Sequence, residues 1–156
     1  MKKNQKGFSL IELLIVVAII LIIAAIAIPN LLRSRMAANE ASAVGSIRTV
    51  NTAAVTYSTT YPATGYPVAL SQLAPATPAT STSADLIDSV LSGGTKSGYT
   101  FKMTVGSGAS TPQTSYSVAA APVSTSSGTR TFYSDQSGVI RGDPTTTATS
   151  TSAPLQ

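Results

Sequence analysis

The strongest pattern in the chain is a long apolar run near its beginning. From Phe8 to Ile28 the run carries a single charged residue, Glu12, and Pro29 follows it. A helix of roughly 21 residues rises about 1.5 Å per residue and measures about 31 Å, the thickness of the hydrocarbon core of a bilayer. The pattern therefore predicts a membrane-spanning helix over residues 8–28.

The residues that flank this run differ from those of an ordinary signal peptide. Lys2, Lys3 and Lys6 precede it, and the small residue Gly7 stands at the junction between polar and apolar sequence. A secretory signal peptide usually has a shorter apolar core, with its small-residue cleavage site after that core. Here, cleavage after Gly7 would remove only a short basic leader, residues 1–7, and would leave the apolar helix at the new amino terminus.

Pro29 has two interpretations, because a proline inside a helical pattern either ends the helix or kinks it. Apolar residues continue at helical spacing beyond it, which favours a kink and an amphipathic continuation over residues 29–61. The apolar stripe comprises Val44, Ile47, Val50, Ala54, Tyr57 and Tyr61. The residues expected mostly on the other side, or in contacts between subunits, are Arg33, Arg35, Asn39, Ser46 and Arg48.

Alternating apolar and polar residues predict strands in the second half of the chain. The clearest alternation covers residues 99–105, and weaker strands are expected at 116–121 and 129–134. Residues 135–138 form a short connection containing glycine, which predicts a hairpin into residues 139–141. An antiparallel sheet of three or four strands on the C-terminal half of the long helix, an α+β fold, is the simplest arrangement.

Between the long helix and the sheet, the sequence predicts a surface loop and a short helix. Prolines and glycine mark the loop after Tyr61, and four apolar residues are expected to attach it to the globular head: Tyr66, Val68, Leu70 and Leu73. Ser83 or Asp85 can cap the short helix, Gly93 and Gly94 end it, and Asp85 and Asp88 suit its positive N-terminal end. Its apolar face consists of Leu86, Ile87, Val90 and Leu91.

The charge of the chain is concentrated in the leader. Formal net charge is +4, but removal of the three leader lysines from the ten basic residues leaves seven against six acidic ones. We therefore predict no specific nucleic acid partner, although Arg33, Arg35 and Arg48 are basic. The leader lysines instead predict orientation, with the N-terminal end in the cytoplasm and the head, residues 62–144, on the other side of the membrane.

The composition argues against an enzyme. The chain has no histidine and no cysteine, so the usual nucleophile, general-base and zinc arrangements are missing, and no disulfide supports the head. We expect no catalytic residue, cofactor or metal. Asp135 and Asp143 flank the final hairpin, but two carboxylates fall short of the six to eight oxygen ligands that calcium takes, which favours solvated turn residues.

Two segments rich in serine and threonine, residues 76–83 and 145–152, have a composition that buries no core. The favoured interpretation of residues 145–156 is a flexible, solvated tail. The alternative is that these hydroxyls carry O-linked glycans on an exposed surface.

The amino-terminal stretch KGFSLIELLIVVAIILIIAAIAIPN resembles the prepilin leader and N-terminal helix of type IV pilins and of the related type II secretion pseudopilins. The resemblance implies cleavage between Gly7 and Phe8, N-methylation of Phe8, and extraction of the subunit from the membrane into a helical filament. It also implies the pilin fold. Many type IV pilins have a disulfide-closed loop near the C-terminus, and this chain departs from that pattern.

Glu12 needs a partner in an apolar environment. A carboxylate within the membrane costs on the order of 2.5 to 3.5 kcal/mol by insertion scales, which makes an unpaired one a poor choice for a plain anchor. In a bundle of identical staggered helices, the nearest positive charge is the freed amine of Phe8 on a neighbouring subunit. The other interpretation is that Glu12 lies among the headgroups and is solvated.

Together these features predict a structural subunit of a type IV pilus-like filament that supports adhesion, motility or DNA uptake. Its expected partners are identical subunits, a prepilin peptidase and N-methyltransferase, an inner-membrane assembly platform and minor pilins. The subunit would span the inner membrane once and then join an extracellular filament. One alternative is a type II secretion pseudopilin; another is an adhesive or ligand-binding minor pilin, with recognition by the loops 62–83 and 106–114.

Overall fold

The computed structural model describes residues 7–106 and 111–155, and the chain divides into two units, Met1–Arg35 and Met36–Gln156. Helix α1, Leu10–Thr60, contributes to both units and contains Pro29. The predicted continuation of the helix beyond Pro29 is therefore confirmed. The predicted kink stays a prediction.

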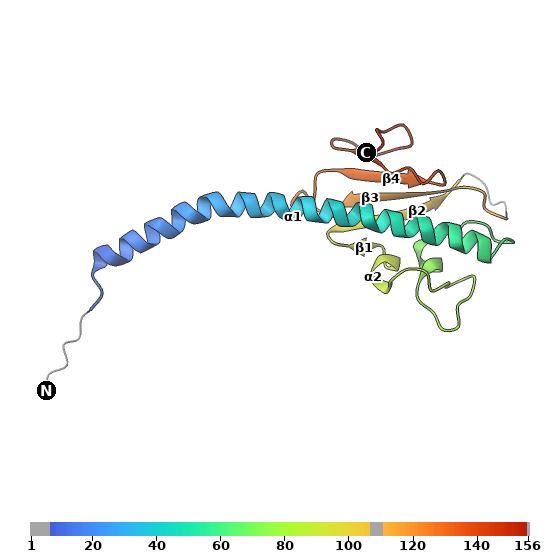
Figure 1. The fold of residues 1–156 in the computed structure, drawn as a ribbon, viewed down its shortest axis with the longest axis horizontal. Coiled ribbons are helices and arrows are strands. Elements are labelled where there is room, and N and C mark those ends of the chain that lie inside the picture. Colours follow the sequence, from blue (N-terminus) through green and yellow to red (C-terminus); the bar gives the residue numbers. More distant parts are fainter. Residues whose placement is uncertain (1–6, 107–110, 156) are drawn as a thin grey trace. The chain divides into compact units, whose positions relative to one another are not determined.

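The second unit contains one antiparallel sheet (Figure 1). Its five strands lie in sequence order, so that each pairs with the next along the chain. They are β1 (Thr95–Lys96), β2 (Tyr99–Val105), β3 (Tyr116–Pro122), β4 (Thr131–Asp135) and β5 (Arg141–Asp143). A long helix with an antiparallel sheet confirms the predicted α+β class.

The core of this unit lies between the sheet and one face of α1. Ile47, Val50 and Tyr57 are fully buried there, together with Phe132 and Val118 from the strands. They share the core with further residues of the helix and strands, among them Ala43, Ala54, Tyr99 and Phe101. The stripe predicted from helical spacing is thus the buried face of α1, with Val44 and Tyr61 partly buried at its margins.

Two polar residues expected on the other side of α1 lie instead against the head. Ser46 is buried, because its small side chain fits where the helix meets the core. Asn39 is half-buried, and its Nδ2 donates to the carbonyl oxygen of Ser127 at 2.9 Å. Glu40 follows it, and its Oε1 accepts from the backbone N–H groups of Thr129 at 3.0 Å and Arg130 at 3.4 Å. Asn39 and Glu40 therefore hold the β3–β4 connection on the helix.

A small polar network crosses the core between helix and sheet. Asn51 Nδ2 donates to Ser134 Oγ at 2.8 Å, and the Tyr116 hydroxyl donates to Asn51 Oδ1 at 3.1 Å. Ser134 has no exposed surface, and its hydroxyl donates in turn to the carbonyl oxygen of Val139 at 3.1 Å. Because buried polar groups must be paired, this network restricts how α1 can sit on β3 and β4.

The sheet differs from the prediction at its ends. It has five strands instead of three or four, because the two residues of β1 pair with the start of β2. The final hairpin is present, but β5 begins at Arg141 and not at Val139. The carbonyl oxygen of Val139 accepts from the Ser134 side chain, and Gly138 has a left-handed φ of 73°, so the turn extends through Val139.

The short helix α2, Ser89–Ser92, also begins later than predicted, and its cap is Asp88. Asp88 Oδ1 accepts from the backbone N–H groups of Val90 and Leu91 at 3.1 and 2.9 Å. Ser83 and Asp85 do not cap it, since the N–H groups of residues 84–87 donate to backbone carbonyls of the 72–74 segment. Val90, expected on the apolar face of this helix, is exposed.

The loop that precedes α2 is attached largely as predicted. Leu70 and Leu73 are buried within a 3₁₀ helix, Leu70–Leu73, and Tyr66 packs on Tyr116 with ring centroids 4.8 Å apart. Val68 is 42% exposed, so its predicted role is wrong. The backbone N–H of Val68 itself donates to the Gln72 side chain, and this hydrogen bond keeps Val68 at the surface.

The segment predicted as a solvated tail is attached to the sheet at Ala148 and Leu155, although most of its residues are exposed. Ala148 is only 3% exposed, and its N–H donates to Thr131 Oγ1 at 2.8 Å. Leu155 N donates to the carbonyl oxygen of Ile140 at 2.8 Å, and its side chain packs against the core. Composition misses this because two apolar residues and backbone pairing are enough to attach a polar segment.

The core network generates a prediction for stability. Asn51→Ala leaves the Tyr116 hydroxyl and Ser134 without their partner, so we expect the free energy of unfolding to fall by about 1–3 kcal/mol. Thermal unfolding of the full chain in detergent, followed by near-UV circular dichroism, measures this. Thr59→Ala is the control, because Thr59 is exposed and bonds only its own helix. An equal, small effect of both substitutions would show that the network contributes no stability.

Two buried tyrosines generate a prediction for alkaline pH. Burial raises the pKa of Tyr99 and of Tyr116 from 10.0 to about 12, assisted by the charge of Glu40 beside Tyr99 and by Tyr66 and Asp135 beside Tyr116. Because the folded pKa values lie above the unfolded ones, stability is retained below pH 10 and lost as the pH rises towards 12. Ultraviolet titration of tyrosinate should show a late step that shrinks in Tyr99→Phe and in Tyr116→Phe. An unchanged late step in both variants would contradict the assignment.

Candidate functional site

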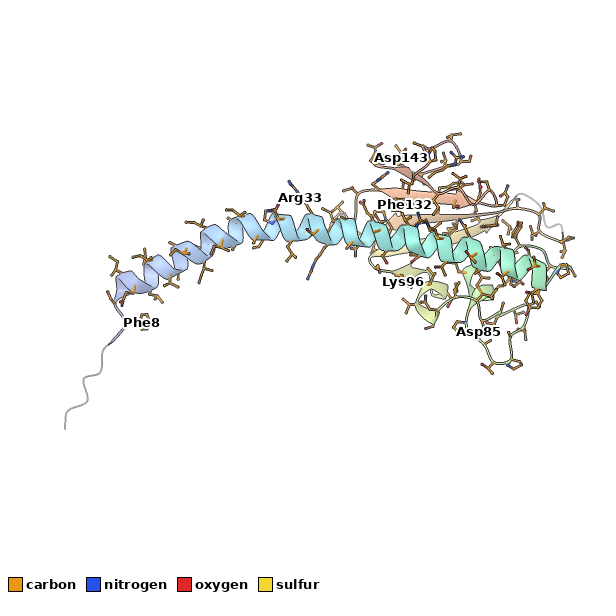
Figure 2. All side chains as sticks on the ribbon, viewed as in Figure 1. Phe8, Arg33, Asp85, Lys96, Phe132 and Asp143 are labelled. Carbon is orange, nitrogen blue, oxygen red and sulfur yellow. The ribbon has the colours of Figure 1, made fainter. Side chains whose placement is uncertain are left out.

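The predicted cleavage junction lies just outside the long helix. Gly7, Phe8 and Ser9 precede α1 and have no helical structure, and the first helical residue is Leu10. Phe8 is 86% exposed, and Figure 2 shows its side chain at the N-terminal end of α1. Gly7 is exposed as well, with no atom within 4 Å of the position that a Cβ would take. The Gly7–Phe8 bond is therefore accessible; residues 1–6 of the leader lie outside the described residues.

The first turn of α1 is fixed by Ser9 and Glu12. The backbone N–H of Ser9 donates to Glu12 Oε2 at 2.9 Å, and the carbonyl oxygen of Ser9 accepts from Leu13 N at 3.3 Å. This is the glutamate half of a capping box, in which a Ser or Thr before the helix is followed three residues later by Glu. The negative side chain also suits the positive end of the helix dipole. Glu12 thus has a structural task in its own chain.

Sequence reasoning singled out Glu12 but missed Ser9. The spacing Ser-x-x-Glu immediately before an apolar run is a recognised helix-start signal and was available in the sequence. The bond between Ser9 and Glu12 also affects the hypothesis that Glu12 pairs with the Phe8 amine of a neighbouring subunit. Among the described residues, Ser9 N occupies only one of the two carboxylate oxygens, so Oε1 can accept from a second donor.

The helix surface beyond this cap is apolar all round. The large apolar side chains from Leu10 to Leu32 are between 44% and 79% exposed, and Figure 2 shows them projecting on every side of this part of α1. By length and composition, α1 is a candidate membrane span. A soluble monomer rarely exposes so much continuous apolar surface, which marks contact with lipid or with other protein.

Pro29 and the polar residue Asn30 interrupt this surface near its end, before Leu31 and Leu32. Pro29 lies inside α1 and supplies no backbone N–H for the helix. Arg33 and Arg35 follow with exposed side chains. Gly7 and Phe8 therefore lie in the segment just before α1, and Glu12 and Pro29 lie within α1. The structure does not bring these four residues into contact with one another.

The carboxylates considered for calcium are occupied by their own turns. Asp135 Oδ1 accepts from Ser137 N at 2.9 Å, and Asp143 Oδ1 accepts from the N–H groups of Thr145 and Thr146, each at 2.8 Å. These bonds lower the pKa of Asp143 to about 2. Within residues 7–106 and 111–155, no three His, Cys, Asp or Glu side chains gather where they could hold a metal ion. The interpretation as turn residues is the one that the geometry supports.

The loops considered for recognition differ in how far they are described. In the loop 62–83, the Ser81 carbonyl oxygen accepts from the Tyr57 hydroxyl at 2.5 Å, and Thr80 and Ser83 pair through their backbones. This loop is therefore bound to α1 and folded on itself. Part of the loop 106–114 lies outside the described residues.

Comparisons with known proteins concern the amino-terminal part of the chain. Residues 2–28 match the family model of the prokaryotic N-terminal methylation motif. A 38-residue segment is 66% identical to the type IV wide pilus major component PilA4 of Thermus thermophilus, covering 24% of this chain and 29% of that protein. The match thus spans less than a third of the relative's length. No solved structure matches the chain. The amino-terminal segment of this protein therefore carries the prokaryotic N-terminal methylation motif and is homologous to the corresponding segment of a type IV pilin.

Proposed function

We propose that this protein is the structural subunit of a type IV pilus-like filament. The observation that carries the proposal is a methylation motif joined directly to a helix whose apolar surface is uncovered in the isolated chain. A helix of this kind can bury its apolar surface either in a bilayer or against other helices. The relative PilA4 is named as a major pilus component, and the proposal extends that role to this chain as a homopolymer.

Maturation would begin at the accessible junction. The Gly7–Phe8 bond lies before the helix start at Leu10, so a prepilin peptidase could reach it without unwinding the helix. Cleavage frees the amine of Phe8, which the same enzyme or an associated methyltransferase would methylate. The leader lysines would keep this end in the cytoplasm and direct the head across the inner membrane.

Assembly would depend on Glu12. One carboxylate oxygen accepts from Ser9 N of the same chain, while the other can accept from the Phe8 amine of a neighbouring subunit. Pairing removes the cost of a bare carboxylate in an apolar bundle, on the order of 2.5 to 3.5 kcal/mol. It also favours one stagger between adjacent helices, because only that stagger places the amine beside the carboxylate.

The remaining steps would rest on other components. An inner-membrane assembly platform would extract the subunit, minor pilins would start or end the filament, and the filament would extend to the cell surface. Adhesion, motility or DNA uptake would then follow from the motors and tip proteins that accompany it.

Two substitutions of Glu12 separate its two tasks. Glu12→Ala removes both the charge and the oxygen that caps the helix, whereas Glu12→Gln keeps an oxygen for Ser9 N and removes only the charge. If the ion pair directs assembly, filament yield falls to background in both variants, while membrane insertion of the subunit is unchanged. Filament recovery by shearing and membrane extraction measure the two effects. Normal filament yield from Glu12→Gln would contradict the ion pair and leave capping as the role of Glu12.

Intact-mass spectrometry of sheared filaments tests the proposed function itself. We expect abundant protein in the sheared fraction that starts at methylated Phe8; additional mass would report glycosylation. Processed protein that stays entirely in the membrane fraction would favour a type II secretion pseudopilin. Protein that retains residues 1–7 would contradict maturation at Gly7.

A further inference from the structure

The last strand of the sheet, β5, is covered on its outer edge by a short piece of the same chain. Gly142 N donates to the carbonyl oxygen of Ala153 at 3.1 Å, and Leu155 N donates to the carbonyl oxygen of Ile140 at 2.8 Å. Residues 153–155, here termed the closing segment, therefore run antiparallel to β5. Figure 1 shows the C-terminal part of the chain, in red, beside the sheet.

The backbone geometry suits the sequence of this segment. Pro154 pairs with Arg141, and the two bonds above flank this pair without using the N–H of residue 154. A proline is tolerated at such a position, because it removes no bond from the ladder. Arg141 Nη1 also donates to the carbonyl oxygen of Ser152 at 3.0 Å, which secures the entry to the segment.

A side-chain slot accompanies the backbone pairing. A Cβ at the buried Gly142 would lie 3.0 Å from Leu155 Cδ2 and 3.4 Å from Phe132 Cδ1. The missing side chain at Gly142 is therefore what makes room for Leu155 against Phe132, which Figure 2 labels on the sheet. Leu155 is the apolar anchor of the closing segment.

The connection between β5 and the closing segment is long and polar. It covers residues 144–152. Thr131 of β4 holds it to the sheet, because Thr131 Oγ1 donates to the Thr146 carbonyl oxygen and accepts from Ala148 N. Nine extended residues span up to about 30 Å. The chain contains no cysteine, so no disulfide ties this segment to its own strand. The connection is therefore long enough to carry the closing segment away from its own β5.

We propose that the edge of β5 and the slot at Gly142 form a strand-accepting site for an extended Ala-Pro-Leu segment. The chain's own closing segment fills the site in the isolated subunit, and the closing segment of a second copy fills it when copies are close together. A second copy is the fitting occupant because it presents the same backbone pattern and the same leucine. Sheet edges bind added strands in this way, with the backbone supplying affinity and a pocket supplying specificity.

Binding of a peptide in trans tests the site. The full chain lacking residues 153–156, in detergent, should bind a labelled peptide of residues 149–156 in a fluorescence anisotropy titration. Two matched controls should each weaken binding at least tenfold: a peptide with Leu155→Asp, and a truncated chain with Gly142→Val, which fills the slot. Absence of binding by a truncated chain with native near-UV circular dichroism would overturn the proposal, as would equal binding of the control peptide.

Disulfide trapping distinguishes the two occupants and does not require the truncated chain to fold. Arg141 and Pro154 form a non-hydrogen-bonded cross-strand pair, a spacing suited to a disulfide. Arg141→Cys with Pro154→Cys in one chain should close within that chain, and the two single variants, mixed in membranes, should form a mixed dimer. In the control, the Pro154→Cys variant is mixed with a Thr100→Cys variant in place of Arg141→Cys. Thr100 lies on β2 and not on β5, so no mixed dimer is expected.

The outcomes of the trapping experiment are separable from those for the filament. Failure of the double variant to close would overturn the pairing of the closing segment with β5. Closure without any mixed dimer would overturn the exchange between copies. Neither result depends on cleavage at Gly7 or on Glu12, so the proposed pilus function is tested independently.

Discussion

Burial of one face of α1 against the sheet is the interaction on which the head depends. Ile47, Val50 and Tyr57 lose all their exposure there, and each fully buried large apolar side chain contributes about 1.5–3 kcal/mol. The polar groups that cross this interface, Asn51 and Ser134, are paired with each other. The sequence contains no cysteine, so this packing must supply the stability that disulfides supply in other small domains.

The same helix presents the opposite situation toward its N-terminus. Its large apolar side chains are exposed, and nothing within the unit Met1–Arg35 covers them among residues 7–35. Such a surface is stable only in lipid or against other protein, so the physical chemistry of the helix allows a membrane state and an assembled state. A charge-paired Glu12 would favour the assembled state, because pairing requires a second copy.

The head shows how a small sheet manages its edges without cysteine. The closing segment uses two backbone bonds and one leucine to cover β5, and Asn39 and Glu40 attach the β3–β4 connection to α1. These are individually weak contacts of the kind that can open locally before the core does.

The sequence by itself determined the elements whose signal is local. The apolar run, the stripe through Ile47 and Tyr57, and the alternation in β2 each depend on spacing along one element, and Gly7, Phe8 and Glu12 follow from a contiguous motif. Only the tertiary structure decided the roles of Glu40 and Ser46, the start of α2 at Ser89, and the position of Leu155. Those depend on which distant backbone groups are already paired. Contacts between residues 89 positions apart, such as Glu40 with Thr129, produce no periodic pattern in the sequence.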